Sequence, residues 1–143
     1  GYKKLDKRPD EILTEIIFPV PKPGTGIHFE KVSKRKTLDI ASVNSAIRIR
    51  VNKEVIEDVA LSLGGVAPFP LFLSATCDYL EGNPVDRETV LHAIEVAQSE
   101  IAPISDIRGS AEYKRLLARQ LLIAHFTKIF PERLTVREFY ETP

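Results

Sequence analysis

The residues whose types and spacing could take part in chemistry are concentrated in segment 31–39. This segment holds four basic side chains and a carboxylate, and it lies between two predicted strands. A loop that is fixed by strands on both sides can present its charges to a ligand held by another domain. The alternative is an ordinary solvated loop tip. The segment is therefore a candidate binding site, but it is not a complete active site.

The other reactive residue types do not combine into a recognisable catalytic or metal-binding group. His28, His92 and His125 are expected on one strand and two different helices, none with a second ligand at metal-binding spacing, so we interpret them as isolated surface or edge histidines. Cys77 has no basic neighbour in the sequence and is predicted to serve packing. Residues 64–65 are both glycine but lack the following lysine and hydroxyl residue of a phosphate-binding loop.

The composition is that of one ordinary domain. The chain has 143 residues, 43% of them hydrophobic, and its 20 basic and 20 acidic residues balance, which disfavours nucleic acid or an anionic membrane surface as a partner. A single cysteine excludes an intrachain disulfide and a cysteine-rich cluster. No apolar run reaches the roughly 20 residues that span a bilayer, and we expect a cytoplasmic protein. The absence of methionine favours a fragment of a longer protein over a complete chain whose initiator methionine has been removed.

The pattern in the first half of the chain predicts an antiparallel sheet. Its segments alternate between apolar and polar residues or are rich in β-branched ones, and turn-forming residues separate them. A spacer over residues 20–26, rich in proline and glycine, is expected to pair the first two strands as antiparallel neighbours. The predicted strands are residues 11–19, 27–32, 40–51 and 55–63.

In the second half the apolar residues recur at helical spacing. We predict helices over residues 68–82, 86–103 and 111–130, the second capped by Asp86 and the third by Ser110. Strands in one block followed by helices in another predict an α+β fold of two layers: an antiparallel sheet of three or four strands with three helices packed on one face. We expect a single domain, with a sheet over 11–63, helices over 70–130 and a surface strap over 131–143.

Several segments together resemble a known family. They are an Asp-Glu-Ile-Leu opening with a strand that ends in Phe-Pro (10–19), an aromatic residue and a lysine that lead into a basic loop and Asp-Ile-Ala (29–41), a Leu-Gly-Gly-Val-Ala-Pro segment (63–68), and a loop with the start of a helix (108–116). In this order and spacing they are similar to the C-terminal domain of the flavin subunit of molybdenum hydroxylases, the family of xanthine dehydrogenase and carbon monoxide dehydrogenase.

The resemblance implies a set of cofactor contacts. In that family a larger N-terminal domain, absent from this chain, binds FAD, and the smaller domain closes against it near the isoalloxazine ring. The matching positions here are Leu13, as an apolar flavin contact, and Lys31, as a lysine that reaches the cofactor. Arg35 and Asp39 fall on the loop near the ring. The molybdopterin and the [2Fe–2S] clusters are expected on partner subunits or domains.

The implied function is a part of an oxidoreductase. Molybdenum oxidises the substrate, iron–sulfur centres relay the electrons, and FAD passes them to an external acceptor. This chain would close over FAD and support that transfer, so we expect the isolated chain to be colourless and without catalytic activity. The alternative is a stand-alone docking or assembly module of the same fold that needs no cofactor.

Overall fold

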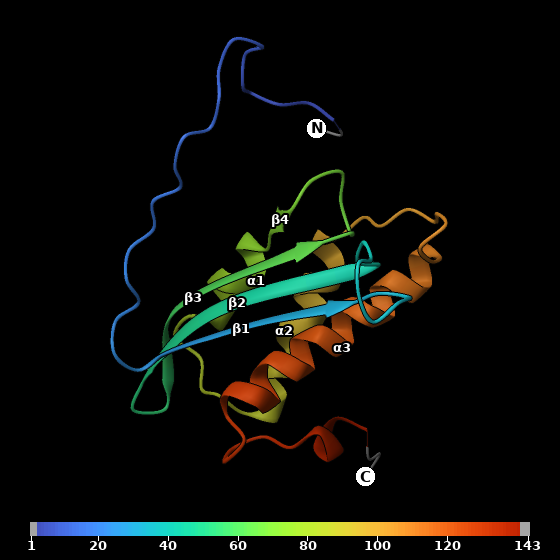
Figure 1. Cartoon of the computed structure of the whole chain (residues 1–143). Helices are drawn as coiled ribbons and strands as arrows, with labels where there is room; N and C mark the ends of the chain where they lie inside the picture. The colour runs from blue at the N-terminus through green and yellow to red at the C-terminus, as the bar shows by residue number, and fades with distance from the viewer. Residues whose placement is uncertain (1–2, 141–143) are drawn as a thin grey trace.

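The structure is a computed structural model that describes residues 3–140, and in it four strands form one antiparallel sheet in the order β1-β2-β3-β4 (Figure 1). The strands are β1 (Thr25–Val32), β2 (Val43–Asn52), β3 (Val55–Gly64) and β4 (Leu71–Phe72). Within the described residues three α-helices and a short 3-10 helix follow: α1 (Ser74–Leu80), α2 (Arg87–Glu100), α3 (Ala111–Ile129) and η1 (Val136–Phe139). This order of elements confirms the predicted α+β class.

The alternating pattern of β2 separates the two faces of the sheet. Ile47 and Ile49 are buried and pack with the helices, which cover one face of the sheet (Figure 1). The residues that alternate with them lie on the opposite face, where Arg48 pairs with Asp58 and Arg50 with Glu57 across the β2–β3 ladder. A period of two along a strand places alternate side chains on opposite faces, so the core was predictable from this segment.

The predicted strand over residues 11–19 is wrong. This segment is extended and exposed, and it leaves the sheet as an arc (Figure 1). The chain does turn between this segment and β1, where the Thr25 N–H donates to Lys22 O at 3.1 Å and Gly24 has φ +79°, but the segment then lies away from β1 and forms no ladder with it (Figure 1). The β-branched residues of the segment therefore reflect strand propensity that is not realised by pairing with the free edge of β1.

The first predicted helix is shorter than the pattern indicated. Leu71 lies opposite Leu63 in the β3–β4 pair, and the backbone N–H of Leu73 donates to Leu61 O at 2.9 Å. Helix α1 then starts at Ser74, and the carboxylate of Glu100 accepts hydrogen bonds from the N–H groups of residues 75 and 76 at 3.0 and 2.8 Å. Because this capping carboxylate comes from the end of α2, local sequence does not reveal where α1 begins.

The two longer helices begin at the predicted caps. The Asp86 carboxylate accepts from the Thr89 N–H at 2.8 Å, and the Ser110 hydroxyl accepts from the Tyr113 N–H at 3.1 Å. Each cap satisfies one of the N–H groups that the first turn of a helix leaves without a partner. The capped helices bring α2 and α3 against the sheet at defined positions.

Replacement of Ser110 by alanine is expected to lower the free energy of unfolding by about 1 kcal/mol, because the first turn of α3 loses its side-chain acceptor. Chemical denaturation followed by circular dichroism measures this change. Ser99→Ala is the matched control, since the Ser99 hydroxyl only donates back to Val96 O inside α2. Equal midpoints for the two variants would contradict the capping role.

The C-terminal tail is packed more firmly than the predicted surface strap. Leu134 and Phe139 are buried, and the Arg87 Nε donates to Glu138 O at 2.8 Å. The tail therefore closes one end of the core against α2 and α3. Residues 141–143 of the predicted strap lie outside the described residues.

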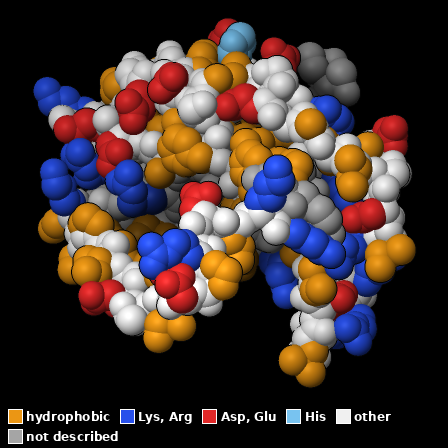
Figure 2. Space-filling view, turned by 90° about the horizontal axis from the view of Figure 1, so that it is seen from above, with side chains coloured by type: hydrophobic (Ala, Val, Ile, Leu, Met, Phe, Trp, Pro, Cys, Tyr) orange, Lys and Arg blue, Asp and Glu red, His pale blue; other side chains and the backbone are white. Residues whose placement is uncertain are grey.

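Charged side chains are dispersed over the surface. Figure 2 shows basic, acidic and hydrophobic side chains intermixed on the face that it presents. This agrees with the balanced composition of the chain. Across residues 3–140, the helices are all too short or too polar to cross a bilayer.

Candidate functional site

The structure brings three of the four predicted cofactor contacts together in one loop. We call residues 31–39, which run from the end of β1 toward β2, the basic loop. Lys31 Nζ donates to Asp39 O at 3.0 Å, and the Arg35 N–H donates to Asp39 Oδ2 at 2.8 Å. This backbone hydrogen bond holds the pKa of the Asp39 carboxyl below its usual value, and the Arg35 guanidinium 3.6 Å from Oδ1 acts in the same direction. The carboxylate thus organises the loop in its charged form.

Leu38, at the tip of the basic loop, has an unusual backbone conformation. Its φ is +50°, in the left-handed region, and its side chain is 95% exposed. For a bulky residue this conformation costs about 1–2 kcal/mol. The Arg35 guanidinium stabilises it by donating to Leu38 O at 2.8 Å. A large apolar side chain held open to solvent at such a cost is typical of a contact surface.

A cavity of about 810 Å³ opens next to the basic loop. Its walls come from the start of β2, from the end of β3 and from the turn that precedes α3. A few charged side chains line the cavity among mostly apolar ones. This is the composition of sites that bind a small organic molecule and orient it with a few polar contacts. The lining includes Ile40, Ser42, Gly65, Asp106, Arg108 and Lys114.

The charged residues of this cavity were not among the predicted site residues. Lys114 is almost completely buried, and its ammonium lies 2.9 Å from Asp106 Oδ1. Arg108 lies 3.5 Å from the same carboxylate group. A sequence signal existed, because Lys114 falls three residues before Leu117 on the apolar side of the third predicted helix. A lysine in that place needs a counter-charge.

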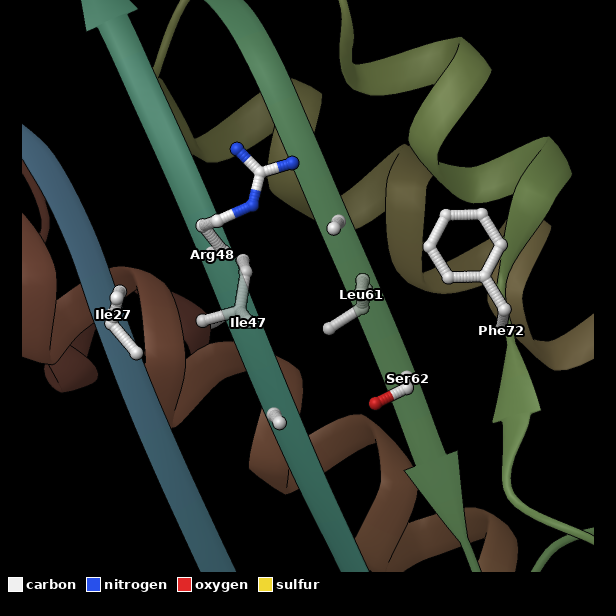
Figure 3. A pocket seen from close by; sticks show the side chains of 8 residues that line it. Ile27, Ile47, Arg48, Leu61, Ser62 and Phe72 are labelled. Carbon is white, nitrogen blue, oxygen red and sulfur yellow. The ribbon is translucent and has the colours of Figure 1, made fainter. Parts of the chain in front are cut away.

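The outer face of the sheet carries an exposed apolar stripe that ends at the basic loop. Ile27, Phe29 and Lys31 alternate along β1 and lie on its exposed side. Beside them is a shallow cavity of about 240 Å³ on the face that the helices leave uncovered. In Figure 3, Ile27 of β1 and Phe72 of β4 stand on either side of this cavity, and the Arg48 side chain leans from β2 toward β3. The exposed apolar side chains Ile27 and Phe29 thus lead to the predicted lysine.

Leu13, the fourth predicted contact, lies outside this group. Its side chain is 74% exposed on the extended segment before β1, which Figure 1 shows bending away from the sheet. The role of Leu13 as a flavin contact stays a prediction.

The interpretation of the histidines as isolated is wrong for His28 and His125. The Nδ1 atoms of these two residues lie 2.7 Å apart, and the rings meet edge to face with centroids 4.9 Å apart. His125 is fully buried, and burial together with the neighbouring His28 lowers its pKa to about 4. His92 lies on the surface, as predicted. The described residues contain no group of three or more His, Cys, Asp or Glu that could hold a metal ion.

Cys77 of α1 is buried in the core, which confirms its packing role. Burial raises the pKa of its thiol to about 11. A thiol with so high a pKa is protonated at neutral pH and is a poor nucleophile.

Comparisons with known proteins show which proteins this chain resembles. The chain is 34% identical over 114 residues to the carbon monoxide dehydrogenase medium chain of Afipia carboxidovorans, an alignment that covers 80% of this chain and 39% of that protein. It is 28% identical over 135 residues to xanthine dehydrogenase 1 of Arabidopsis thaliana, which covers 91% of this chain and 10% of the relative. Among solved structures, carbon monoxide dehydrogenase from Hydrogenophaga pseudoflava superposes with a TM-score of 0.74 at 30% identity, over 81% of this chain and 40% of that one.

The chain thus spans about two-fifths of the length of the medium chains that it matches. The model of the CO dehydrogenase flavoprotein C-terminal domain matches residues 28–129, from the histidine of β1 that pairs with His125 to the last residue of α3. This stretch contains the basic loop, the large cavity and the turn before α3. The chain belongs to the family of CO dehydrogenase flavoprotein C-terminal domains.

Proposed function

We propose that this chain is the part of a flavin subunit that closes over FAD in an oxidoreductase of the molybdenum hydroxylase type. The observation that carries the proposal is the basic loop, where Lys31 and Arg35 both donate hydrogen bonds to Asp39, and the lining of the large cavity begins at the next residue, Ile40. Membership of the family supports the assignment of this loop to the flavin. The larger part of the FAD site and the molybdenum and iron–sulfur centres would belong to partner domains or subunits.

The residues of the loop fit one edge of a flavin. Lys31 supplies a cation, which matches the negative charge that an electron-rich ring or a phosphate group carries. Leu38 and the neighbouring Ile40 supply exposed apolar surface that could cover a ring and exclude water from it. FAD, when bound, supplies the redox chemistry. The chain's own residues bind one edge of it, orient it and shield it.

The apolar stripe on β1 supports a protein partner at the same place. Ile27 and Phe29 are each 60% exposed and lead directly to Lys31. A domain that covered this stripe would also lie over the lysine. One interface would then bury both the apolar stripe and the edge of the cofactor beside Lys31. We therefore place the FAD-binding domain against the outer face of the sheet at its β1 side.

In the complete enzyme, Lys31→Ala is expected to weaken FAD retention or to slow reoxidation of the flavin by roughly tenfold, because one charge-assisted contact is worth about 1–3 kcal/mol. Oxidation of the substrate at the molybdenum site should not change. The FAD content after gel filtration and the rates of the two half-reactions, measured separately by stopped-flow absorbance, test both statements.

The matched control is Lys36→Ala, which removes the same charge from the same loop. Lys36 belongs to the exposed tip and is not among the predicted contacts. If both variants behave like the unmodified enzyme, the proposal fails and a docking module without a cofactor becomes the better description. If both lose FAD equally, the effect is one of net charge and not of the Lys31 position.

A further inference from the structure

The most deeply buried charge beside the cavity is that of Lys114. Its side chain is 3% exposed, and Nζ lies 2.9 Å from Asp106 Oδ1 and donates to Ile104 O at 2.8 Å. A buried ammonium is unfavourable unless it is paired and hydrogen-bonded, and here both requirements are met. The hydrogen bond from Lys114 also holds the pKa of the Asp106 carboxyl below its usual value. The Asp106 carboxyl is therefore charged at neutral pH.

The Asp106 carboxylate shapes the turn formed by residues 104–109. Its Oδ1 accepts a hydrogen bond from the Arg108 N–H at 2.8 Å. The backbone groups of Asp106 and Gly109 exchange two hydrogen bonds, at 3.0 and 3.1 Å, which close the turn. Since Lys114 fixes the same oxygen, the position of the turn depends on the buried ion pair.

Two hydrogen bonds then connect this turn with the basic loop. Lys34 Nζ donates to Ile107 O at 2.6 Å, and the Ser42 hydroxyl donates to Arg108 O at 2.8 Å. Lys34 lies near the beginning of the basic loop and Ser42 just beyond its end. The turn at 104–109 thus holds the basic loop on both sides.

We propose that Lys114 is a positioning residue that, through Asp106 and the turn at 104–109, holds the basic loop in its observed conformation. The mechanical part of this inference rests on the contacts above. Only its consequence for the flavin rests on the proposed function. Lys114 acts through other residues and is not assigned a contact with the cofactor.

Limited proteolysis of the 143-residue chain tests the mechanical part. Trypsin cuts after Lys34, Arg35 and Lys36, and the rate of cutting in a folded protein follows the population of the opened loop. In Lys114→Met we expect these cuts to be roughly tenfold faster than in the original chain. In Lys114→Arg, which keeps a cation at this position, we expect a rate closer to that of the original chain. Lys128→Met, an exposed lysine change on the same helix, is the matched control and should not alter them.

A second variant tests whether the loop can open without loss of folding. Lys34→Gln removes one connection at the surface, leaves the core untouched and retains the cutting sites at Arg35 and Lys36. It should also accelerate cleavage of the loop, with a thermal midpoint near that of the original chain. Unchanged cleavage in folded Lys114→Met and in Lys34→Gln would overturn the proposal.

The consequence for the flavin is measured in the assembled enzyme by the FAD midpoint potential and absorption spectrum. We expect Lys114→Met to shift both in the same direction as Lys31→Ala. Lys114→Arg should reverse most of the shift, which a general loss of stability would not explain. Faster cleavage of the loop combined with an unchanged flavin in both the Lys114→Met and Lys31→Ala enzymes would support the positioning role and contradict the proposed function.

Discussion

Lowering the pH from 7 to 4 is expected to reduce the free energy of unfolding of this chain by about 3 kcal/mol through His125 alone. The pKa of this buried imidazole is lowered from an ordinary 6.5 to about 4, first by burial and then by the neighbouring His28. One unit of pKa difference corresponds to about 1.4 kcal/mol. Protonation of both rings would also direct two N–H groups at each other across the 2.7 Å between the Nδ1 atoms.

The direction of the effect follows from linkage. The folded state binds the proton less readily than the unfolded state, so the stabilisation is complete above pH 6.5 and is lost as the pH falls toward 4. Denaturation curves at several pH values measure it. His125→Gln, which does not titrate, should flatten the pH dependence between 6.5 and 4.

His92→Gln is the matched control for this experiment, because His92 is an exposed histidine of α2. It should retain the full pH dependence. If His125→Gln retains the same dependence as His92→Gln, the acid sensitivity originates in other groups and the account of the histidine pair is wrong.

Gly65→Ala is expected to destabilise the chain by about 2–5 kcal/mol. Gly65 has φ +86°, a conformation that costs a residue with a Cβ about 1–2 kcal/mol. In addition, a Cβ at this position would collide with the backbone carbonyl oxygen of Ser42, which cannot rotate away. Shifts forced on packed structure add about 1–3 kcal/mol. The unfolding midpoint in urea is the measurement.

Gly82→Ala separates the two contributions. Gly82 has nearly the same φ, +85°, but open space where the Cβ would lie. It should therefore show only the conformational cost of about 1–2 kcal/mol. Equal effects at the two glycines would show that contact with Ser42 O is unimportant. Because Gly65 and Ser42 both line the large cavity, only the Gly65 variant is also expected to disturb the basic loop.

Local sequence patterns were sufficient to predict much of the fold. The alternation in β2 and β3 and the caps at Asp86 and Ser110 depend on residues within a few positions of one another. Such interactions appear in the sequence because the backbone geometry of one element fixes them. The segment 11–19 shows the limit of this reasoning, since strand propensity does not decide whether a segment lies against the free edge of β1.

Some features of the candidate site were likewise predictable from the sequence, and others depend on the tertiary structure. Lys31, Arg35 and Asp39 lie within nine residues on one loop, and the sequence by itself determined that they would be close. The sequence also determined the α+β class and the family resemblance, because periodicity and motif order are properties of the chain. Only the tertiary structure decided that Lys34 would reach Ile107, 73 residues away, and that His28 would meet His125, 97 residues away. Contacts at such separations depend on how the sheet and helices pack, and no local pattern records the docking of one element on another.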